Sequence, residues 1–481
     1  MIFRLLSAVT AATTLAMSLP ILAAAWSGDG GFRALVMAFL AGACVSALLV
    51  WAGRGASISG MSARDALLSV IVSWLAASAL TALPYIFSGA APTPLDAFFE
   101  GVSGFTTTGV SVIRDLESAP RSIRLWRSFS EWIGGLGIIV LILAVLPSAG
   151  ASGAGMWLYK AELSSPVHER LTPRIQQTAV FLWKTYIALT AAQIFFLLWG
   201  GLDLYDSATL AFSTVSTGGF SPYSDNVGHF EGNYVKWVTA VFLFLSGINL
   251  TLYHTLIVGR NPSRVWGNPE TRFYVVIFLA FGSLISAILY SHGVFRSLRT
   301  SILEGFFYTI SMLSTGGFFI SDYETWPAVT RFLMMIMAFC GGCAISTTGG
   351  LTCVRVVVII KHVWDEFTRL LHQGAIIPTR LGDSAVDAEV VSSCFAYLSA
   401  YMIAFFTGFA LLTLFGEDPT AALSGAAAAL GNIGPGFGIG PSAGLTLGKT
   451  SVKLVSMALM LCGRLEIFTL IVIFTPRFWR R

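Results

Sequence analysis

The sequence predicts an all-α polytopic membrane protein, and three observations carry that prediction. The chain has 481 residues, of which 55% are hydrophobic and only 11% charged, and a mean hydropathy of +0.75 is too apolar for a soluble protein of this size. Several apolar segments reach the roughly 20 residues that a helix needs to cross a bilayer. The alternating pattern of a transmembrane barrel is absent. This composition excludes a disordered chain, a secreted disulfide scaffold and a dedicated nucleic-acid-binding protein.

About ten transmembrane helices are expected from apolar runs that end at charges, glycines or prolines. They are residues 4–26, 33–53, 65–88, 128–147, 177–200, 234–258, 273–292, 328–360, 389–415 and 450–475. The first run also fits a cleavable signal peptide, because Arg4 precedes it and small residues follow it. We favour an uncut helix, since ten spans place both termini on one side. The eighth run is too long for one straight crossing.

The loops on the two predicted sides differ in charge. Segments on the side of the termini hold 15 Lys and Arg and 9 acidic residues, whereas the opposite segments hold 11 and 15. The positive-inside rule makes the basic side cytoplasmic, so both termini are expected in the cytoplasm. Lys184 and Arg355 are expected to snorkel at cytoplasmic helix ends. Glu466 is the one acid that these spans enclose in our assignment.

Four segments between the spans share one form, a short helix followed by a loop that ends in glycine. Each is too short to cross the membrane and lies between two full spans. The segments are residues 96–109, 206–219, 304–317 and 421–434. The sequence therefore predicts two extra N-terminal helices in residues 1–60 and four repeated units, at residues 61–150, 175–260, 271–362 and 386–481.

The repeated unit has the properties of a pore loop. Acids near the start of the short helices (Asp96, Asp206, Glu304 and, a little earlier, Asp418) favour the positive helix end, so the other end presents partial negative charge. Non-helical backbone at membrane depth is tolerated where it lines a watery cavity. Glycine lets carbonyl oxygens replace the hydration shell of an ion, and four glycine-bearing loops suit potassium better than sodium. Thr and Gly in helix-packing contacts are the simpler alternative.

These residues resemble a known family, and the resemblance covers nearly the whole chain. The motifs that carry it are Thr106-Thr-Thr-Gly109, Ser216-Thr-Gly-Gly-Phe220, Ser314-Thr-Gly-Gly-Phe318, Asn432-Ile-Gly-Pro-Gly436, the run from Gly341 to Gly350, and Gly463-Arg-Leu-Glu-Ile-Phe-Thr469. The chain resembles the membrane subunits of the Trk/Ktr/HKT superfamily of potassium transporters, most closely the bacterial TrkH/TrkG type.

The resemblance implies potassium uptake across the bacterial inner membrane through a selectivity filter. The implied filter residues are Thr107, Thr108, Gly109, Thr217, Gly218, Gly219, Thr315, Gly316, Gly317, Asn432, Ile433 and Gly434. It also implies a homodimer and a cytoplasmic nucleotide-binding regulatory subunit of the TrkA type. Potassium is then the transported ion, and we expect neither a cofactor bound by this chain nor a nucleic-acid partner.

The eighth apolar run contains a break that could act as a gate. Glycine and Ser/Thr residues in mid-membrane free backbone groups, so the break should border a cavity, although a simple kink is the alternative. Resemblance favours an intramembrane gating loop. Its residues are Gly342, Cys343, Ser346, Thr347, Thr348, Gly349 and Gly350. Ile345 stands where the family typically has glycine, and Thr352 where it has lysine.

Arg464 lies within the last span, where a charge costs at least about 2.5–3.5 kcal/mol unless it faces a partner or the interior. In the family an arginine at this motif lies in the pore near the gating loop, which implies an electrostatic barrier to cations. A pair with Glu466 or a snorkelling contact is the alternative. Residues two positions apart on a helix, such as Arg464 and Glu466, do not face each other, which weighs against the pair.

Two other function classes compete with a potassium pore. Gly101-Val-Ser103-Gly104 and Gly440-Pro-Ser442-Ala-Gly444 match serine-hydrolase strings, with His254 as the available base. The first lies in a repeated short helix and the second lacks the strand and helix that a nucleophile needs, so an intramembrane protease is disfavoured. A proton- or sodium-coupled transporter is the closer rival, but parallel repeats favour a central pore.

Overall fold

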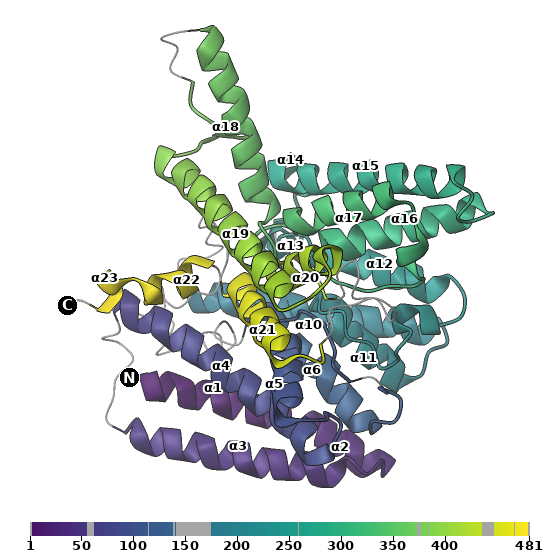
Figure 1. The fold of residues 1–481 in the computed structure, drawn as a ribbon, viewed down its shortest axis with the longest axis vertical. Coiled ribbons are helices and arrows are strands. Elements are labelled where there is room, and N and C mark those ends of the chain that lie inside the picture. Colours follow the sequence, from purple (N-terminus) through teal and green to yellow (C-terminus); the bar gives the residue numbers. More distant parts are fainter. Residues whose placement is uncertain are drawn as a thin grey trace.

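The structure is a computed structural model in which helices dominate (Figure 1). It describes residues 2–54, 62–113, 115–137, 140, 175–257, 259–372, 377–382, 384–434, 447–465 and 467–479. The two strands of this part, β1 (Arg380–Leu381) and β2 (Ser384–Ala385), form a single antiparallel pair. The prediction of an all-α polytopic membrane protein is therefore confirmed.

Two helical segments precede the repeated units. Helices α1 (Ile2–Ala16) and α2 (Ser18–Ser27) form one apolar stretch, and α3 (Phe32–Ala52) returns beside α1. The two pack closely because Gly42 leaves room for Thr14; a Cβ at Gly42 would lie 2.4 Å from the Thr14 hydroxyl. Small residues and hydrogen-bonded hydroxyls are the usual contacts between helices in lipid.

The rest of the described chain forms four groups, each with an outer helix, a half-helix and a broken or shortened inner segment. The first group is α4 (Ala63–Ser88), α5 (Pro94–Phe105) and α6 (Arg121–Leu136). The second is α10 (Ile175–Trp199), α11 (Leu204–Val215), α12 (Tyr234–Ser246) and α13 (Leu250–Ile257). The third is α15 (Pro269–Ser291), α16 (Leu298–Leu313), α17 (Ala328–Cys340) and α18 (Cys353–Leu371). The fourth is α19 (Ala388–Leu414), α20 (Pro419–Gly431), α21 (Thr450–Arg464) and α22 (Ile467–Ile471).

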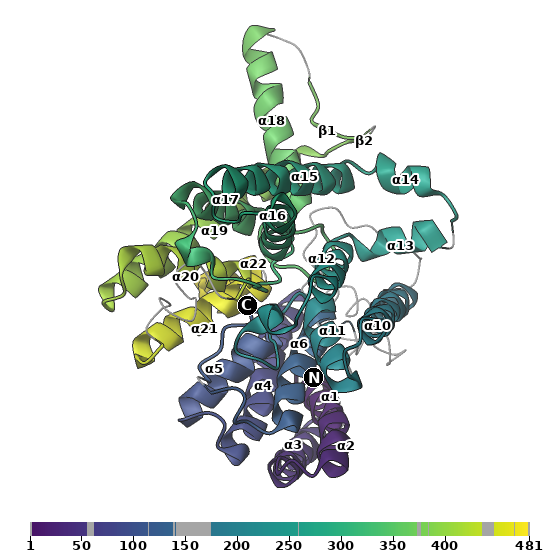
Figure 2. The same ribbon diagram turned by 90° about the vertical axis from the view of Figure 1, so that its right-hand side faces the viewer.

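The four groups follow one another around a ring. Helix α6 packs on α11, α12 on α16, α17 on α20, and α21 on α5, which closes the circle. Figure 2 shows the groups in this order around the middle of the molecule, with α18 extending beyond the rest. Short elements complete the described chain: α14 (Pro262–Gly267), α23 (Pro476–Trp479) and the 3-10 turns Asn226–His229, Tyr323–Thr325 and Val472–Phe474.

The membrane spans differ in detail from those expected. The described residues contain six helices that are long and apolar enough to cross a bilayer, or up to eight if each bent pair is one span. The expected span 234–258 is bent by 91° between α12 and α13. The expected span 328–360 is two helices separated by the non-helical residues 341–352. The end of the expected span 128–147 lies outside the described residues.

Helix α6 begins at Arg121, well before the apolar run that predicted it. An apolar criterion misses this start because two arginines of the first turns, Arg124 and Arg127, are buried with partners. Helix α16 also begins early, at Leu298, so Glu304 lies beyond its first turn. The expected acid near the half-helix start is found in α5 and α11, and Asp418 is the N-cap of α20.

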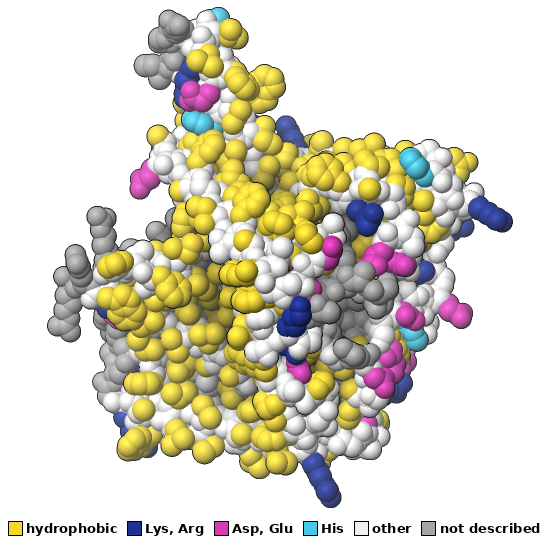
Figure 3. Space-filling model, in the orientation of Figure 1, with side chains coloured by type: hydrophobic (Ala, Val, Ile, Leu, Met, Phe, Trp, Pro, Cys, Tyr) yellow, Lys and Arg dark blue, Asp and Glu magenta, His cyan; other side chains and the backbone are white. Residues whose placement is uncertain are grey.

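The surface has the distribution of a protein that sits in a bilayer. In Figure 3, hydrophobic side chains cover most of the left and lower part of the visible face, and charged side chains gather toward the right-hand margin and on the projecting α18. Many large apolar side chains are exposed, among them Leu40, Trp51 and Phe196. Such exposure is expected where lipid replaces water as the solvent.

Candidate functional site

The four half-helices end in the same backbone motif. In each, one residue takes a left-handed conformation with φ near 54°: Thr107, Thr217, Thr315 and Asn432. The next amide bonds back to the carbonyl five residues earlier, as in Thr108 N to Ser103 O (2.8 Å) and Gly218 N to Ser213 O (2.8 Å). Gly316 to Ser311 (2.8 Å) and Ile433 to Ala428 (2.9 Å) repeat this bond. These are Schellman helix ends.

The residue type at these helix ends is unusual. Glycine normally occupies the left-handed position, because any Cβ costs roughly 1–2 kcal/mol there and a β-branched residue is a genuine outlier. Three of the four positions are threonine. Strain that recurs in three copies of one motif is typical of a functional constraint. The backbone of these loops is thus held by the surrounding structure against its local preference.

Four loops meet where the half-helices end. We name them loop 1 (107–109), loop 2 (217–219), loop 3 (315–317) and loop 4 (432–434). Each ends in a glycine with φ between 63° and 91°: Gly109, Gly219, Gly317 and Gly434. The twelve residues that the sequence predicts as filter residues all lie in these loops, and all but the half-buried Gly109 are buried. The loops therefore lie at the residues where the repeated motifs predict them, and each ends at the predicted glycine.

Successive loops touch through their glycines. A Cβ on Gly109 would lie 2.2 Å from the Gly218 carbonyl oxygen, and one on Gly219 would lie 2.7 Å from that of Gly316. A Cβ on Gly434 would lie 2.6 Å from the Thr108 carbonyl oxygen, so loop 4 returns to loop 1. Asn432 also donates from Nδ2 to the Thr108 hydroxyl (3.0 Å). The middle carbonyls of loops 1, 2 and 3 therefore each lie against the glycine of a neighbouring loop, and at these three junctions there is no room for a side chain on the glycine.

A buried carboxylate lies behind loop 2, and the sequence analysis missed it. Glu131 on α6 is fully buried and accepts the Phe220 amide with both oxygens, at 3.2 and 3.3 Å. A Cβ on Gly218 would lie 2.3 Å from its Cδ. Our assignment of Glu466 as the one acid within a span is wrong, because Glu131 falls inside the expected span 128–147. An acid within an apolar run was the available signal.

A buried ion pair joins the first half-helix, α5, to α6, and its arginine also contacts the segment that follows loop 2. Arg127 on α6 binds Glu100 on α5 (Nε to Oε1, 2.7 Å), with 2% and 0% of the two side chains exposed. The Arg127 guanidinium lies 3.9 Å from the Phe220 ring centre and donates to the Ser221 carbonyl (3.3 Å). Glu100 also accepts from the Ser111 hydroxyl (2.9 Å). This buried pair therefore binds the segments that directly follow loops 1 and 2.

Replacing Arg127 by methionine should lower stability by about 3–5 kcal/mol, because Glu100 then stays buried without its cation. The measurement is the melting temperature of the detergent-purified protein. The double variant E100Q/R127M should recover much of the loss, since neither charge remains. The control is R369M, in the exposed Arg369–Glu366 pair, which should cost no more than about 1 kcal/mol. Equal losses for R127M and R369M would contradict the role of the buried pair.

The non-helical residues 341–352, which contain the predicted intramembrane loop, lie directly against the ring of loops. The Thr217 hydroxyl of loop 2 donates to the Thr347 carbonyl (3.1 Å). The Gly349 amide donates to the Thr315 hydroxyl of loop 3 (2.8 Å). A Cβ on Gly349 would lie 2.5 Å from the Gly431 carbonyl oxygen, next to loop 4. The strained threonine side chains therefore connect the ring to this loop.

The loop closes on itself through glycine. A Cβ on Gly341 (φ 68°) would lie 2.4 Å from the Gly349 carbonyl oxygen, and Gly350 has φ 80°. Ile345 and Thr352, where this chain departs from the family pattern, also have positive φ, at 53° and 68°. A left-handed backbone at position 345 is the conformation that glycine, which the resemblance implies there, adopts most easily. Isoleucine there adds strain of about 1–2 kcal/mol to the loop.

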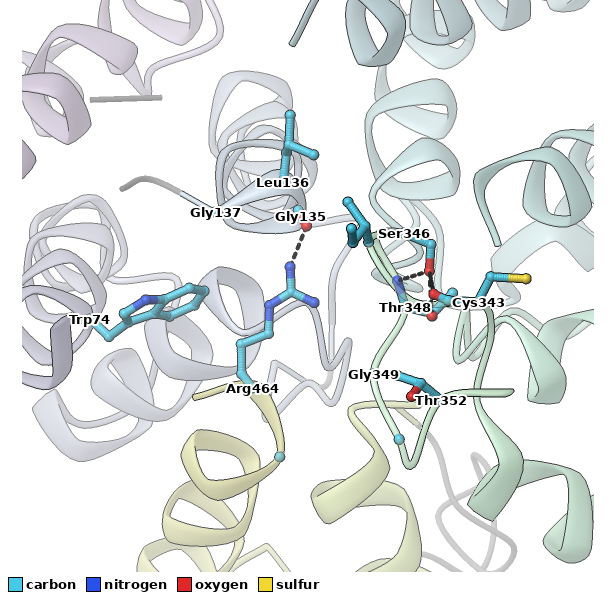
Figure 4. A pocket seen from close by; sticks show the side chains of 13 residues that line it. Trp74, Gly135, Leu136, Gly137, Cys343, Ser346, Thr348, Gly349, Thr352 and Arg464 are labelled. Carbon is cyan, nitrogen blue, oxygen red and sulfur yellow. Dashed lines mark hydrogen bonds between the residues drawn. The ribbon is translucent and has the colours of Figure 1, made fainter. Parts of the chain in front are cut away.

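Arg464, at the end of α21, points at this loop and at the end of α6. It donates to the carbonyls of Thr347 (2.9 Å), Gly134 (2.8 Å) and Gly135. Figure 4 shows the guanidinium in a cavity with Trp74 on one side, the loop residues Ser346 and Thr348 on the other, and Gly135 and Leu136 above its tip. Carbonyl oxygens thus hold the charge inside the protein. Glu466, the alternative partner, lies outside the described residues.

Other residues from the sequence analysis have different surroundings from those expected. Arg355 does not snorkel: it is buried, with its guanidinium 3.9 Å from the Tyr397 ring centre, whereas Lys184 is exposed. Ser103 is buried within α5, and its carbonyl belongs to the helix end described above. Ser442 lies outside the described residues.

A family model described as a cation transport protein, TrkH, matches residues 33–481. The chain belongs to the TrkH family. Membership in a family of transporters confirms the prediction of a non-enzymatic transport protein and disfavours the protease interpretation.

Individual TrkH-family relatives match over nearly their whole length. The potassium uptake protein TrkH of Salmonella typhimurium is 35% identical over 466 residues, which is 96% of each chain. TrkG of Escherichia coli K12 is 36% identical over 421 residues, covering 87% of this chain and 86% of TrkG. The crystal structure of the potassium transporter TrkH from Vibrio parahaemolyticus matches with a TM-score of 0.89 and 32% identity, covering 100% of this chain and 99% of that one.

Proposed function

We propose that this chain takes up potassium across the bacterial inner membrane, and that loops 1–4 are its selectivity filter. The ring of glycine-bearing loops carries the proposal. Carbonyl oxygens that replace the hydration shell of K⁺ need a backbone without side chains in the way. The four half-helix ends add partial negative charge at the same place. The relatives named as potassium uptake proteins support K⁺ as the ion.

In this proposal the filter residues have two roles. The loop residues Thr107, Thr108, Gly109, Thr217, Gly218, Gly219, Thr315, Gly316, Gly317, Asn432, Ile433 and Gly434 surround the ion with backbone oxygens. The left-handed positions turn the chain at each helix end, and the glycines let adjacent loops approach. The four units at residues 61–150, 175–260, 271–362 and 386–481 then build the pore, with residues 1–60 packed outside it.

The intramembrane loop is proposed as the gate. Gly342, Cys343, Ser346, Thr347, Thr348, Gly349 and Gly350 belong to a segment that hydrogen-bonds the filter loops and Arg464. A cation that leaves the filter on this side meets both the loop and a fixed positive charge. Flux therefore requires that the loop moves away and that Arg464 is displaced or neutralised by new contacts.

The family membership also supports a proposal for partners and placement. The relatives are named as parts of a Trk system, which favours a multi-component assembly. We propose a homodimer with both termini in the cytoplasm and a nucleotide-binding regulatory subunit of the TrkA type on that side. The chain itself carries no cofactor in this proposal, and K⁺ is its cargo.

The test is uptake of ⁸⁶Rb⁺ into proteoliposomes that hold the purified chain, with a K⁺ diffusion potential. A K⁺-selective pore predicts uptake that rises with the inside-negative potential, since 100 mV is worth about 2.3 kcal/mol per charge. Excess K⁺ should block uptake far better than the same concentration of Na⁺. Empty liposomes are the control. In a coupled transporter the buried Glu131 would be the candidate proton carrier, and uptake that is independent of voltage but needs a proton gradient would favour that alternative.

A further inference from the structure

A single carboxylate joins the two ends of the intramembrane loop. Glu270 is 4% exposed. Its Oε1 accepts the amide of Ala344 (2.6 Å), at the entry of the loop, and the amide of Val354 (3.1 Å), just after its exit. A buried amide that loses its hydrogen-bond partner destabilises the fold, so both bonds hold the loop in place. Glu270 therefore holds both ends of the loop at one point.

The same carboxylate replaces a missing helix cap. Helix α18 begins at Cys353, and within the described chain its N-cap residue Thr352 makes no side-chain capping bond. The first amides of the helix are satisfied from elsewhere, Cys353 by the Gly342 carbonyl (2.8 Å) and Val354 by Glu270. A carboxylate at this end is also favoured by the helix dipole. The start of α18 is consequently fixed by a residue of α15.

Glu270 is itself held firmly in the first turn of α15. Asn268 caps that helix by accepting the amides of Glu270 (2.9 Å) and Thr271 (3.4 Å). Arg272 donates to the Trp266 carbonyl (2.5 Å) and so ties α15 to α14. The residues around α14 form one of the loops predicted to face the cytoplasm. A displacement of this segment would carry the carboxylate with it.

The geometry points to Glu270 as the positioning residue of the gate: it clamps both ends of the intramembrane loop and couples them to the cytoplasmic segment 259–272. This inference rests on the proposed gating function. The tip of the loop is bound to the filter and to Arg464, so the clamp at its base sets how freely the loop can leave the pore.

The first experiment measures ⁸⁶Rb⁺ flux of the full chain in proteoliposomes without any partner subunit. Removing the clamp by E270A should raise this unregulated flux about tenfold, within the roughly 5- to 150-fold range of a typical coupling between sites. The preference for K⁺ over Na⁺ should stay unchanged, because the hydrogen bonds that E270A removes go to Ala344 and Val354, which lie outside loops 1–4. E270Q keeps an oxygen that can accept both amides and should lie between wild type and E270A.

The matched control is E389A. Glu389 is likewise an acid in the first turn of a long apolar helix, α19, on the same predicted side, but it is exposed. Its replacement should leave flux at the wild-type value. Folded E270A with wild-type flux would overturn the clamp, and so would a rise in flux accompanied by lost K⁺ preference, which would mean damage to the filter.

The second experiment reads loop position without transport. Cys343 precedes Ala344 and is 1% exposed. Its labelling by N-ethylmaleimide, followed by peptide mass spectrometry, should increase at least about fivefold in E270A and remain low in E389A. If E270A does not fold, E270Q decides: wild-type flux and labelling there overturn the inference. Wild-type protein without K⁺-selective uptake would refute the proposed function, and the labelling would still decide whether Glu270 clamps the loop.

Discussion

Replacing Gly109 by alanine should lower the preference for K⁺ over Na⁺ at least about tenfold, or roughly 1.4 kcal/mol. The new Cβ would lie 2.2 Å from the Gly218 carbonyl oxygen, so loops 1 and 2 must move apart. The φ of 78° adds about 1–2 kcal/mol of backbone strain for any residue with a Cβ. A ring that depends on close carbonyls cannot absorb this shift. The measurement is competition of K⁺ and Na⁺ against ⁸⁶Rb⁺ uptake.

The control for this substitution is G89A. Gly89, at the end of α4, also has positive φ (69°), but a Cβ there would meet no described atom within 4 Å. It carries similar strain without a clash, so its K⁺ preference should equal that of the wild type. A G109A variant that keeps full selectivity would remove loop 1 from the filter. Loss of selectivity in both variants would assign the effect to general destabilisation.

The ring of loops was predictable because its signal is local and repeated. Four copies of one motif identified Gly109, Gly219, Gly317 and Gly434, and each of these residues has the positive φ that favours glycine. The half-helices before them follow from the same copies. The resemblance placed Arg464 beside the gating loop, and its hydrogen bond to the Thr347 carbonyl agrees with that expectation.

The residues that support the ring were harder to predict. Glu131, Glu100 and Glu270 bind groups that are 11 to 89 residues away in the sequence, so no local pattern reveals them. Buried charges also made the expected start of α6 too late. The apolar run begins at residue 128, whereas the helix begins at Arg121, because its first turns contain buried arginines. Burial of a charge depends on its partner, and the partner comes from the tertiary structure.

Backbone strain at Ile345, in the proposed gate, is another feature that only the structure reveals. The resemblance marked Ile345 as a departure from glycine, but only the backbone angle of 53° gives it a physical meaning. A β-branched residue in a left-handed conformation is strained, and the proposed gate would lose this strain if Ile345 left that conformation on opening. This strain would offset part of the hydrogen bonding that holds the loop to the filter. The gate of this chain should therefore be more easily displaced than one with glycine at this position.

Replacing Arg464 by alanine should raise ⁸⁶Rb⁺ flux about tenfold or more. A fixed positive charge repels a cation at 4 Å by about 4 kcal/mol at an effective dielectric constant of 20, and a tenfold change needs only about 1.4 kcal/mol of the barrier. Alanine also removes the hydrogen bond that holds Thr347 of the intramembrane loop. Both effects act in the same direction. Initial rates at a fixed K⁺ diffusion potential would measure the change.

Lysine and methionine at position 464 separate the two effects. R464K keeps the charge but loses the planar fork that reaches Thr347, Gly134 and Gly135 together. R464M removes the charge and keeps most of the side-chain volume. If charge dominates, R464K should stay near the wild-type flux while R464M resembles alanine; if loop anchoring dominates, both should resemble alanine. Wild-type flux in well-folded R464A and R464M would contradict a barrier and leave Arg464 as a structural link between α21 and α6.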